Sequence, residues 1–244
     1  MEKDYTYEVN NETSDLNQNN ILKPYGYQKL FGQVVDLHLD NINLSMDMTM
    51  ERNLAWALVS LSVEIIEPVK GIIKMHAQTW HSQRKGPFFR REFSFKNKEG
   101  KTLFHGSSFS VLLDINKRTI YRKRVLPFDV IKPEPDGDFT IEADPTTNID
   151  PEFEKVDQRR VHNSHIDCIG HVNNICYGKF AYDAFSEAEC MNIHNLKRMD
   201  LYFKSELKNN DIFSTLKAHE NNKIIVRGYN DAKSENSFDA IFEF

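Results

Sequence analysis

Two kinds of hydrophobic periodicity alternate along the chain, and both halves show them in the same order. In the first half, apolar residues recur at nearly helical spacing from Tyr25 to Leu39, which predicts an amphipathic helix. Ala57–Ile66 then alternates apolar and polar positions, as a strand with one solvated face does. Further strand-like runs, separated by polar turns, lie at Gly71–His81, Phe88–Lys96, Lys101–Asp114 and Thr119–Val125. The first half is therefore predicted to be one helix followed by an antiparallel meander.

The second half begins with another amphipathic segment. Apolar residues on neighbouring i, i+4 rows predict a helix from Tyr177 to Glu189, and Asn173 and Asn174 just before it are candidate N-cap residues. Strand-like runs follow at Met199–Glu206, Ile212–Ala218, Lys223–Tyr229 and Ser237–Phe244. The second half therefore repeats the order of helix and meander.

A faint internal repeat accompanies this shared order. The pairs aligned by an offset of 152 residues are Tyr25-Gly26 with Tyr177-Gly178, Asp15 with Asp167, and Asn19 with His171. Such matches carry weight only together with the matching order of elements. We therefore predict an α+β fold, a tandem (double) hot-dog in which each unit is a long helix wrapped by an antiparallel β-sheet. Only the second copy is expected to carry the histidine.

Composition marks a boundary between the two units. From Pro133 to Glu154 the chain has four prolines, eight acidic residues and neither Lys nor Arg. This composition is typical of a linker rather than a packed element. The prediction is an N-terminal hot-dog over residues 1–132, an acidic linker over 133–155, and a C-terminal hot-dog over 156–244.

Composition also restricts where the protein works. The chain has 244 residues, of which 40% are hydrophobic, but its longest apolar runs are too short to span a bilayer. The N-terminal residues are polar and acidic, without the apolar core of a signal peptide. Three cysteines without a C-x-x-C motif do not form a disulfide framework. We therefore expect a cytoplasmic protein without a membrane span, and either a monomer or a homodimer, since the tandem repeat already supplies the paired sheet.

The net charge of −5 is unevenly distributed. Residues 84–124 contain 12 Lys or Arg against three acidic residues. Bases grouped on adjacent strands can attract an acidic partner, although they can also be ordinary solvated strand faces. The net acidity and the lack of a recognition motif argue against nucleic acid. The bases considered for such a surface are Arg84, Lys85, Arg90, Arg91, Arg122, Lys123 and Arg124.

Residues 161–177, VHNSHIDCIGHVNNICY, hold the densest group of chemically active side chains. Asp167 and His171 can form a carboxylate–imidazole pair in which the carboxylate fixes the ring tautomer and raises its basicity. The N–H groups at the start of the following helix can hold an oxyanion at the same place. This combination suits acyl transfer or hydrolysis without a serine nucleophile. The alternative is that His171 only caps or packs against the helix.

The same segment resembles a family signature. Asp167-x-x-Gly170-His171-Val172-Asn173-Asn174-x-x-Tyr177 is similar to the D-x-x-x-H-V-N-N-x-x-Y motif of the acyl-acyl-carrier-protein thioesterases, the plant enzymes and their bacterial relatives. Further matches in family order are Thr79-Trp80, Arg90-Arg91, Gly100, Asn116-x-Arg118, Pro127 and Leu201-Tyr202-Phe203-Lys204-Ser205-Glu206. The resemblance implies a thioesterase that hydrolyses fatty acyl-acyl carrier protein to free fatty acid and carrier protein in fatty acid biosynthesis.

The resemblance also implies roles for single residues. It makes Asp167, His171 and Glu206 catalytic: one carboxylate activates water while the imidazole orients it or moves its proton. Asn173, Asn174 and the amides at the helix start would position the substrate and stabilise the oxyanion. The N-terminal unit would hold the acyl chain, and the grouped bases would dock the acidic, 4′-phosphopantetheine-bearing carrier. The family asparagine is replaced by Ile169 and the family cysteine by Leu207, so a cysteine nucleophile is not expected.

Three further hypotheses compete with this interpretation. A metal site is the first, because His162, His165, Cys168 and His171 recur at every third residue and Cys176 follows. On a helix these side chains would share one face, but the Gly and Asn residues among them are poor helix formers. We therefore expect neither a metal nor a cofactor. The second hypothesis is an acyl-CoA thioesterase of the hot-dog class, and the third is a non-catalytic acyl-binding hot-dog protein.

Overall fold

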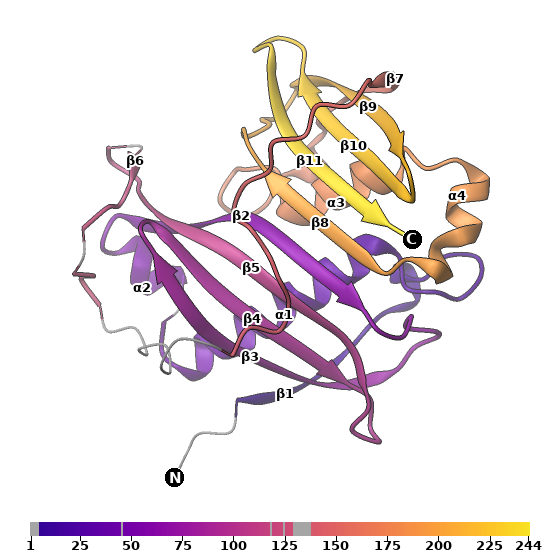
Figure 1. The fold of residues 1–244 in the computed structure, drawn as a ribbon. Helices are drawn as coiled ribbons and strands as arrows, with labels where there is room; N and C mark the ends of the chain where they lie inside the picture. The colour runs from indigo at the N-terminus through magenta and orange to yellow at the C-terminus, as the bar shows by residue number, and fades with distance from the viewer. Residues whose placement is uncertain (1–4, 45, 118, 124, 129–137) are drawn as a thin grey trace.

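The computed structural model describes residues 5–44, 46–117, 119–123, 125–128 and 138–244 (Figure 1). The elements of the first half are β1 (Thr6–Asn10), α1 (Pro24–Asn41), α2 (Met46–Met50), β2 (Leu54–Ile65), β3 (Lys74–Lys85), β4 (Phe88–Lys96), β5 (Thr102–Asp114) and β6 (Thr119–Ile120). Those of the second half are β7 (Glu154–Arg160), α3 (Asn174–Tyr182), α4 (Glu187–Met191), β8 (Arg198–Phe203), β9 (Ile212–Glu220), β10 (Lys223–Asn230) and β11 (Glu235–Glu243). Short 3₁₀ turns lie at Thr13–Asp15, Asn163–His165 and Asn192–Asn195.

The strands form one continuous antiparallel sheet. Its order is β1-β3-β4-β5-β2-β8-β11-β10-β9-β7, with β6 paired to β5. β2 pairs with β8 in the middle, where Ser60 lies opposite Tyr202. Read outward from this seam, the two halves have the same sequence of strands. Figure 1 shows α1 behind the strands of the first half and α3 behind those of the second. The predicted α+β double hot-dog is confirmed.

Aromatic side chains attach each helix to its half of the sheet. Phe31 of α1 stacks on Phe93 of β4, with ring centroids 4.2 Å apart. A Cβ at Gly106 of β5 would lie 2.0 Å from the Phe31 ring, so glycine allows this close approach. In the second half, Phe180 of α3 packs on Phe213 of β9 at 4.9 Å. The apolar positions that predicted the two helices therefore form the core.

The second helix differs from its prediction. The segment predicted as one helix from Tyr177 to Glu189 breaks after Tyr182 and restarts as α4. Ser186 causes the restart, because its hydroxyl accepts from the Glu189 N–H while the Glu189 carboxylate accepts from the Ser186 N–H. This reciprocal capping box is a strong helix-start signal.

Three strands also differ from the sequence prediction. Among the described residues of the run predicted at Thr119–Val125, only Thr119 and Ile120 form a strand. β1 and β7 have no counterpart among the predicted strands. Both are edge strands: β7 has almost only polar side chains, so no hydrophobic pattern marks it, whereas β1 alternates apolar and polar residues over only five positions.

The acidic linker is packed against the sheet over its described part, so the prediction that it is not a packed element is wrong there. Residues 138–153 cross the face of the sheet opposite α1 and α3, and β7 begins at Glu154. Side chains of the sheet donate hydrogen bonds to its carbonyl groups. The pairs are Arg90 Nη2–Ile141 O (2.5 Å), Ser60 Oγ–Asp144 O (2.9 Å), Arg198 Nη2–Glu142 O (2.7 Å) and Arg227 Nη2–Ile149 O (2.6 Å).

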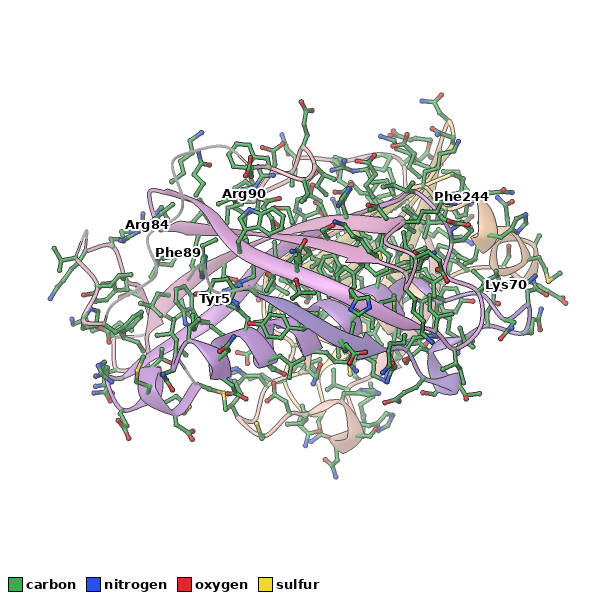
Figure 2. All side chains as sticks on the ribbon, turned by 90° about the horizontal axis from the view of Figure 1, so that it is seen from below. Tyr5, Lys70, Arg84, Phe89, Arg90 and Phe244 are labelled. Atoms are coloured by element: carbon green, nitrogen blue, oxygen red, sulfur yellow. The ribbon has the colours of Figure 1, made fainter. Side chains whose placement is uncertain are left out.

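Two arginines hold this segment in equivalent ways. Arg90 of β4 lies over the ring of Phe139 at 4.1 Å, and Arg227 of β10 lies over Phe153 at 4.5 Å. Figure 2 shows Arg90 on the side of the sheet away from α1. The linker is therefore fixed once on each half of the sheet. None of the helices within the described ranges is long and apolar enough to cross a membrane.

Candidate active site

A tight loop between β7 and α3 carries the predicted catalytic segment. Ile166 and Val172 pair as an antiparallel bridge that closes the loop. At its tip, Asp167 Oδ1 accepts hydrogen bonds from the N–H groups of Ile169 and His171, each 3.0 Å long. Gly170 has a φ of +82°, a left-handed conformation that glycine adopts without strain. The Asp167 side chain and Gly170 thus set the local backbone that presents His171.

The imidazole of His171 faces Glu206 rather than Asp167. His171 Nε2 lies 3.3 Å from Glu206 Oε1. Both side chains are accessible to water, with 58% and 40% of their surfaces exposed. The predicted Asp167–imidazole pair is therefore wrong, because the Asp167 carboxylate binds the backbone of its own loop. Glu206 is the carboxylate that can fix the tautomer of this ring.

The segment after β8 brings Glu206 to this position. The next residue, Leu207, is fully buried, and its N–H donates to the hydroxyl of Tyr177 on α3 at 3.1 Å. Asn209 Nδ2 donates to Asn163 Oδ1, in the turn that precedes the catalytic loop, at 2.8 Å. A buried leucine therefore occupies the position at which the resemblance places a cysteine.

The start of α3 lies directly behind the loop. Asn173 Oδ1 accepts from the Ile175 N–H at 2.9 Å, so the predicted N-cap role of Asn173 is confirmed. Asn174 is exposed and is the first residue of α3. Burial raises the pKa of the Cys176 thiol, which disfavours the thiolate needed for a nucleophile. The positioning roles of Asn173 and Asn174 stay predictions.

The hypothesis of a metal site has no geometric support. His162 and His165 lie on a 3₁₀ turn, whereas Cys168 and His171 lie on the loop that follows it. The spacing of three residues therefore does not place these side chains on one helical face. Within the residues that the structure describes, no group of three His, Cys, Asp or Glu side chains could hold a metal ion.

The first half contains a matching loop, which corrects the predicted repeat. Tyr27 accepts from the Val69 N–H as Tyr177 does from Leu207, and these tyrosines are 150 residues apart. The same offset relates the bridges Leu16–Leu22 and Ile166–Val172. It also relates Asn17 to Asp167, because Asn17 Oδ1 accepts from the N–H groups two and four residues later. The predicted offset of 152 residues is therefore wrong by two.

The corrected offset changes which residues replace the catalytic ones. In the first half, Asn17, Asn19 and Ile21 occupy the places of Asp167, Ile169 and His171. Pro68 occupies the place of Glu206, because the next residues, Val69 and Leu207, donate to the equivalent tyrosines. The predicted pairing of Asn19 with His171 is thus a misalignment, and the true counterpart is an isoleucine. The prediction that only the second copy carries the histidine still holds. The first loop lacks all three predicted catalytic side chains.

Two of the bases predicted to dock a partner cannot do so. Arg90 and Arg91 are only 7% and 6% exposed, because they point to opposite faces of β4 that are both covered. Arg90 lies under the linker, and Arg91 donates to Thr79 Oγ1 at 3.2 Å on the helix side. Burial lowers the pKa of Arg91 to about 10, and its Nη2 lies 2.8 Å from His81 Nε2.

Arg84, Lys85, Arg122 and Lys123, the other predicted bases that the structure describes, lie near one end of β3. Arg84 is half-buried, stacks on the ring of Phe89 at 4.7 Å and donates to the Lys123 carbonyl. Lys85, Arg122 and Lys123 are exposed. Arg124 lies outside the described residues. The basic surface is therefore smaller than the sequence predicts.

The role of Asp167 in the loop predicts a specific effect on stability. We expect Asp167→Asn to leave the free energy of unfolding within about 0.5 kcal/mol of wild type, since an amide Oδ1 accepts the same two N–H groups. Asp167→Ala removes this acceptor and is expected to destabilise the protein by about 1 kcal/mol. Urea unfolding followed by circular dichroism measures both. Equal stabilities of the two variants would contradict this role.

Comparison with known proteins identifies the family. The family model of the acyl-ACP thioesterase N-terminal domain matches residues 2–129, and that of the C-terminal domain matches residues 150–243. The fold is similar to a solved acyl-ACP thioesterase from Bacteroides thetaiotaomicron, with a TM-score of 0.86 and 20% identity over 98% of this chain and 96% of that one. It is also similar to the 12:0-ACP thioesterase from Umbellularia californica, with a TM-score of 0.79 and 12% identity over 99% and 97% of the two chains. A search of curated proteins gives no match. Because the two domain models together cover most of the sequence, the chain belongs to the acyl-ACP thioesterase family.

Proposed function

We propose that the His171–Glu206 pair hydrolyses the thioester of fatty acyl-acyl carrier protein and releases free fatty acid and carrier protein. The observation that supports this most directly is the 3.3 Å approach of His171 Nε2 to the Glu206 carboxylate. This pair lies beside the start of a helix, in a chain whose family hydrolyses acyl-ACP thioesters. Both side chains are open to water, the second reactant.

The reaction follows from this geometry. With Nε2–H donated to Glu206, the free lone pair on Nδ1 of His171 takes a proton from water as the water oxygen attacks the thioester carbonyl carbon. The negative charge on the carbonyl oxygen is held by N–H groups at the start of α3, together with Asn173 and Asn174. The C–S bond then breaks, and the proton on His171 passes to the leaving thiolate. The products are the carboxylic acid and the carrier thiol.

Asp167 has a different role in this proposal. Its Oδ1 holds the His171 backbone, so it positions the ring rather than reacting itself. Asp167→Asn tests this, because it retains the acceptor but removes the charge. If Asp167 were the base that activates water, this variant would lose as much activity as Glu206→Gln.

The exposed bases Lys85, Arg122 and Lys123 attract the acidic carrier in this proposal. We expect the double variant Lys85→Gln/Lys123→Gln to raise KM for acyl-ACP by about tenfold, or about 1.4 kcal/mol, and to change KM for acyl-CoA much less. The expected increase becomes smaller at high salt, which screens exposed charges. Steady-state kinetics with both substrates over a series of acyl chain lengths measures these effects.

The control variant is Lys96→Gln/Lys98→Gln, which removes the same charge at the opposite end of β4. Equal changes in KM for acyl-ACP and acyl-CoA would contradict the carrier-protein assignment. Tight binding of acyl thioesters without any turnover would exclude a thioesterase and support the hypothesis of a non-catalytic acyl-binding protein.

We also propose that the reaction takes place in the cytoplasm. The three cysteines are free: Cys168 is exposed, Cys176 is buried and Cys190 is partly buried. Free thiols are typical of a reducing compartment. The protein is proposed to act as a monomer or a homodimer, since the pairing of β2 with β8 already joins two hot-dog units.

A further inference from the structure

Each unit has a groove between its helix and its edge strand, and under the 150-residue offset the two grooves overlap in part. The first, of about 750 Å³, is lined by β1, the turn that follows it, and α1. The second, of about 560 Å³, is lined by β7, the turn that follows it, and α3. Because the two units are copies of one fold, a difference in chemistry between these grooves indicates a function of one unit.

A lysine occupies the same position in both units but has different neighbours. Lys29 of α1 is neutralised by Glu12 at 2.7 Å and Asp15 at 3.1 Å. The 150-residue offset places Lys179 of α3 over Lys29, and two histidines over these two acids. Among the described residues, no carboxylate lies within 4 Å of Lys179, which instead lies 5.5 Å from the centre of the Tyr25 ring. The charge that is cancelled in the first unit is therefore available in the second.

Among the described residues that line the second groove, Lys and Arg outnumber Asp by three to two: Arg159, Arg160 and Lys179 against Asp157 and Asp183. Arg160 is exposed and, within the described parts of the chain, has no carboxylate within ion-pair distance. Arg159 is neutralised by Asp157 and by Asp183, the latter at 2.8 Å. The pKa of His165 is lowered, first by burial and then by the positive charges of its neighbours. These neighbours are His162, Arg159 and Lys179.

The first groove has the opposite character. Of the described residues that line it, Glu8, Glu12 and Asp36 are acidic and none is Lys or Arg. Burial raises the pKa of Asp36, and the nearby Asp40 raises it further. Of these two grooves, the basic one thus lies in the unit that also carries His171 and Glu206.

The basic groove adjoins the catalytic loop. His165, which lines it, accepts a hydrogen bond on its carbonyl from the Asn173 N–H at 2.8 Å. The Cys176 thiol, another lining group, lies 3.8 Å from the same carbonyl. The groove and His171 therefore lie beside the same short segment at the start of α3.

We propose that Lys179, Arg160 and His162 bind the phosphate of the substrate's pantetheine arm in this groove, an inference that rests on the proposed thioesterase function. The exposed cations Lys179 and Arg160, with the His162 imidazole as a further N–H donor, suit a phosphate, which accepts several hydrogen bonds. The arm carries one phosphate when it is attached to a carrier protein, and CoA contains the same arm. The bases of the first unit then act on the carrier by long-range attraction, whereas the groove contacts the arm itself.

Three thioesters with the same acyl chain test the proposal: acyl-carrier protein, acyl-4′-phosphopantetheine, and acyl-pantetheine, which lacks the phosphate. For Lys179→Gln/Arg160→Gln, we expect KM to rise about tenfold, or about 1.4 kcal/mol, with both phosphate-bearing substrates. KM for acyl-pantetheine and kcat for all three are expected to stay unchanged. Lys29→Gln is the matched control at the equivalent position of the first unit, and its KM values are expected to equal those of wild type.

Any different pattern overturns the proposal. If KM rose for acyl-carrier protein alone, the groove would bind the protein part of the carrier. If KM rose for all three substrates, or for none, a phosphate site would be excluded. Hydrolysis of acyl-pantetheine by wild type tests the thioesterase function separately. If no thioester is hydrolysed, calorimetric binding of the phosphorylated and unphosphorylated thioesters to His171→Ala still tests the groove. Equal affinities would overturn the phosphate site.

Discussion

His171→Ala is expected to lower kcat by about 10²- to 10⁴-fold, the usual contribution of a positioned general base. In the proposed mechanism the imidazole takes the proton from water and later returns it to the leaving thiolate, so both steps lose their proton carrier. The fold is expected to remain intact, because the ring is 58% exposed and packs in no core. Steady-state kinetics with an acyl-ACP substrate measures the loss, and circular dichroism confirms the fold.

Glu206→Gln gives the companion result. The amide has nearly the same size as the carboxylate but cannot stabilise the charged imidazole, so we expect a large loss in kcat with little change in KM. The double variant His171→Ala/Glu206→Gln is expected to be little worse than His171→Ala, since the two residues act as one unit. If the loss in kcat of the double variant equalled the product of the two single losses, the two residues would act independently. A His171→Ala enzyme that keeps more than about a tenth of the wild-type rate would exclude His171 as the base.

Arg90→Ala is expected to destabilise the protein by about 3–5 kcal/mol, the usual cost of removing one partner of a buried ion pair. Glu92 is completely buried, and its carboxylate lies 2.6 Å from Arg90 Nε. Ser82 Oγ and the Thr140 N–H and hydroxyl also donate to this carboxylate. Without the guanidinium, a buried negative charge would lose its only cationic partner among the described residues. The linker would also lose the donor to its Ile141 carbonyl.

Urea unfolding measures this effect, and limited proteolysis reports whether residues 138–153 leave the sheet. Lys101→Ala is the control, because it breaks an ion pair with Glu67 whose side chains are 63% and 43% exposed. It is expected to change the free energy of unfolding by at most about 1 kcal/mol. Arg90→Met/Glu92→Gln should be more stable than Arg90→Ala, since it removes both charges. If Arg90→Ala cost no more than the control, the buried pair would not hold the linker.

The sequence predicted β4 and β5 well because polar turns mark their ends. Phe88–Lys96 is correct at both ends, and Lys101–Asp114 differs by one residue. The edge strand β7 was missed because its side chains are almost all polar, and β1 was missed because its alternation of apolar and polar residues covers only five positions. The break before α4 was readable in principle from Ser186 and Glu189, whose spacing is that of a capping box. Apolar residues on both sides of the break obscured it.

The candidate site was predicted only in part, for two physical reasons. Successive side chains of a strand point to opposite faces, but a run of bases does not reveal that both faces of β4 are covered, so Arg90 and Arg91 were assigned to a surface although both are buried. The match of Tyr25-Gly26 with Tyr177-Gly178 gave an offset that is two residues too large. The equivalent hydrogen bonds of Tyr27 and Tyr177 show that the offset is 150 residues. Glu206 was predicted to be catalytic from its match to the family motif, and only the structure shows that its carboxylate lies close to His171.

The seam between β2 and β8 also affects how the sequence of the protein can evolve. In a dimer of two identical hot-dog chains, every mutation appears in both subunits, so a site lost from one is lost from the other. Here the two copies are different segments of one chain, so each can mutate independently, and they stay joined at any protein concentration. One copy could therefore exchange its histidine for Ile21 while the other kept His171. Fusion of the sheet thus permits a division of labour that a symmetric dimer does not allow.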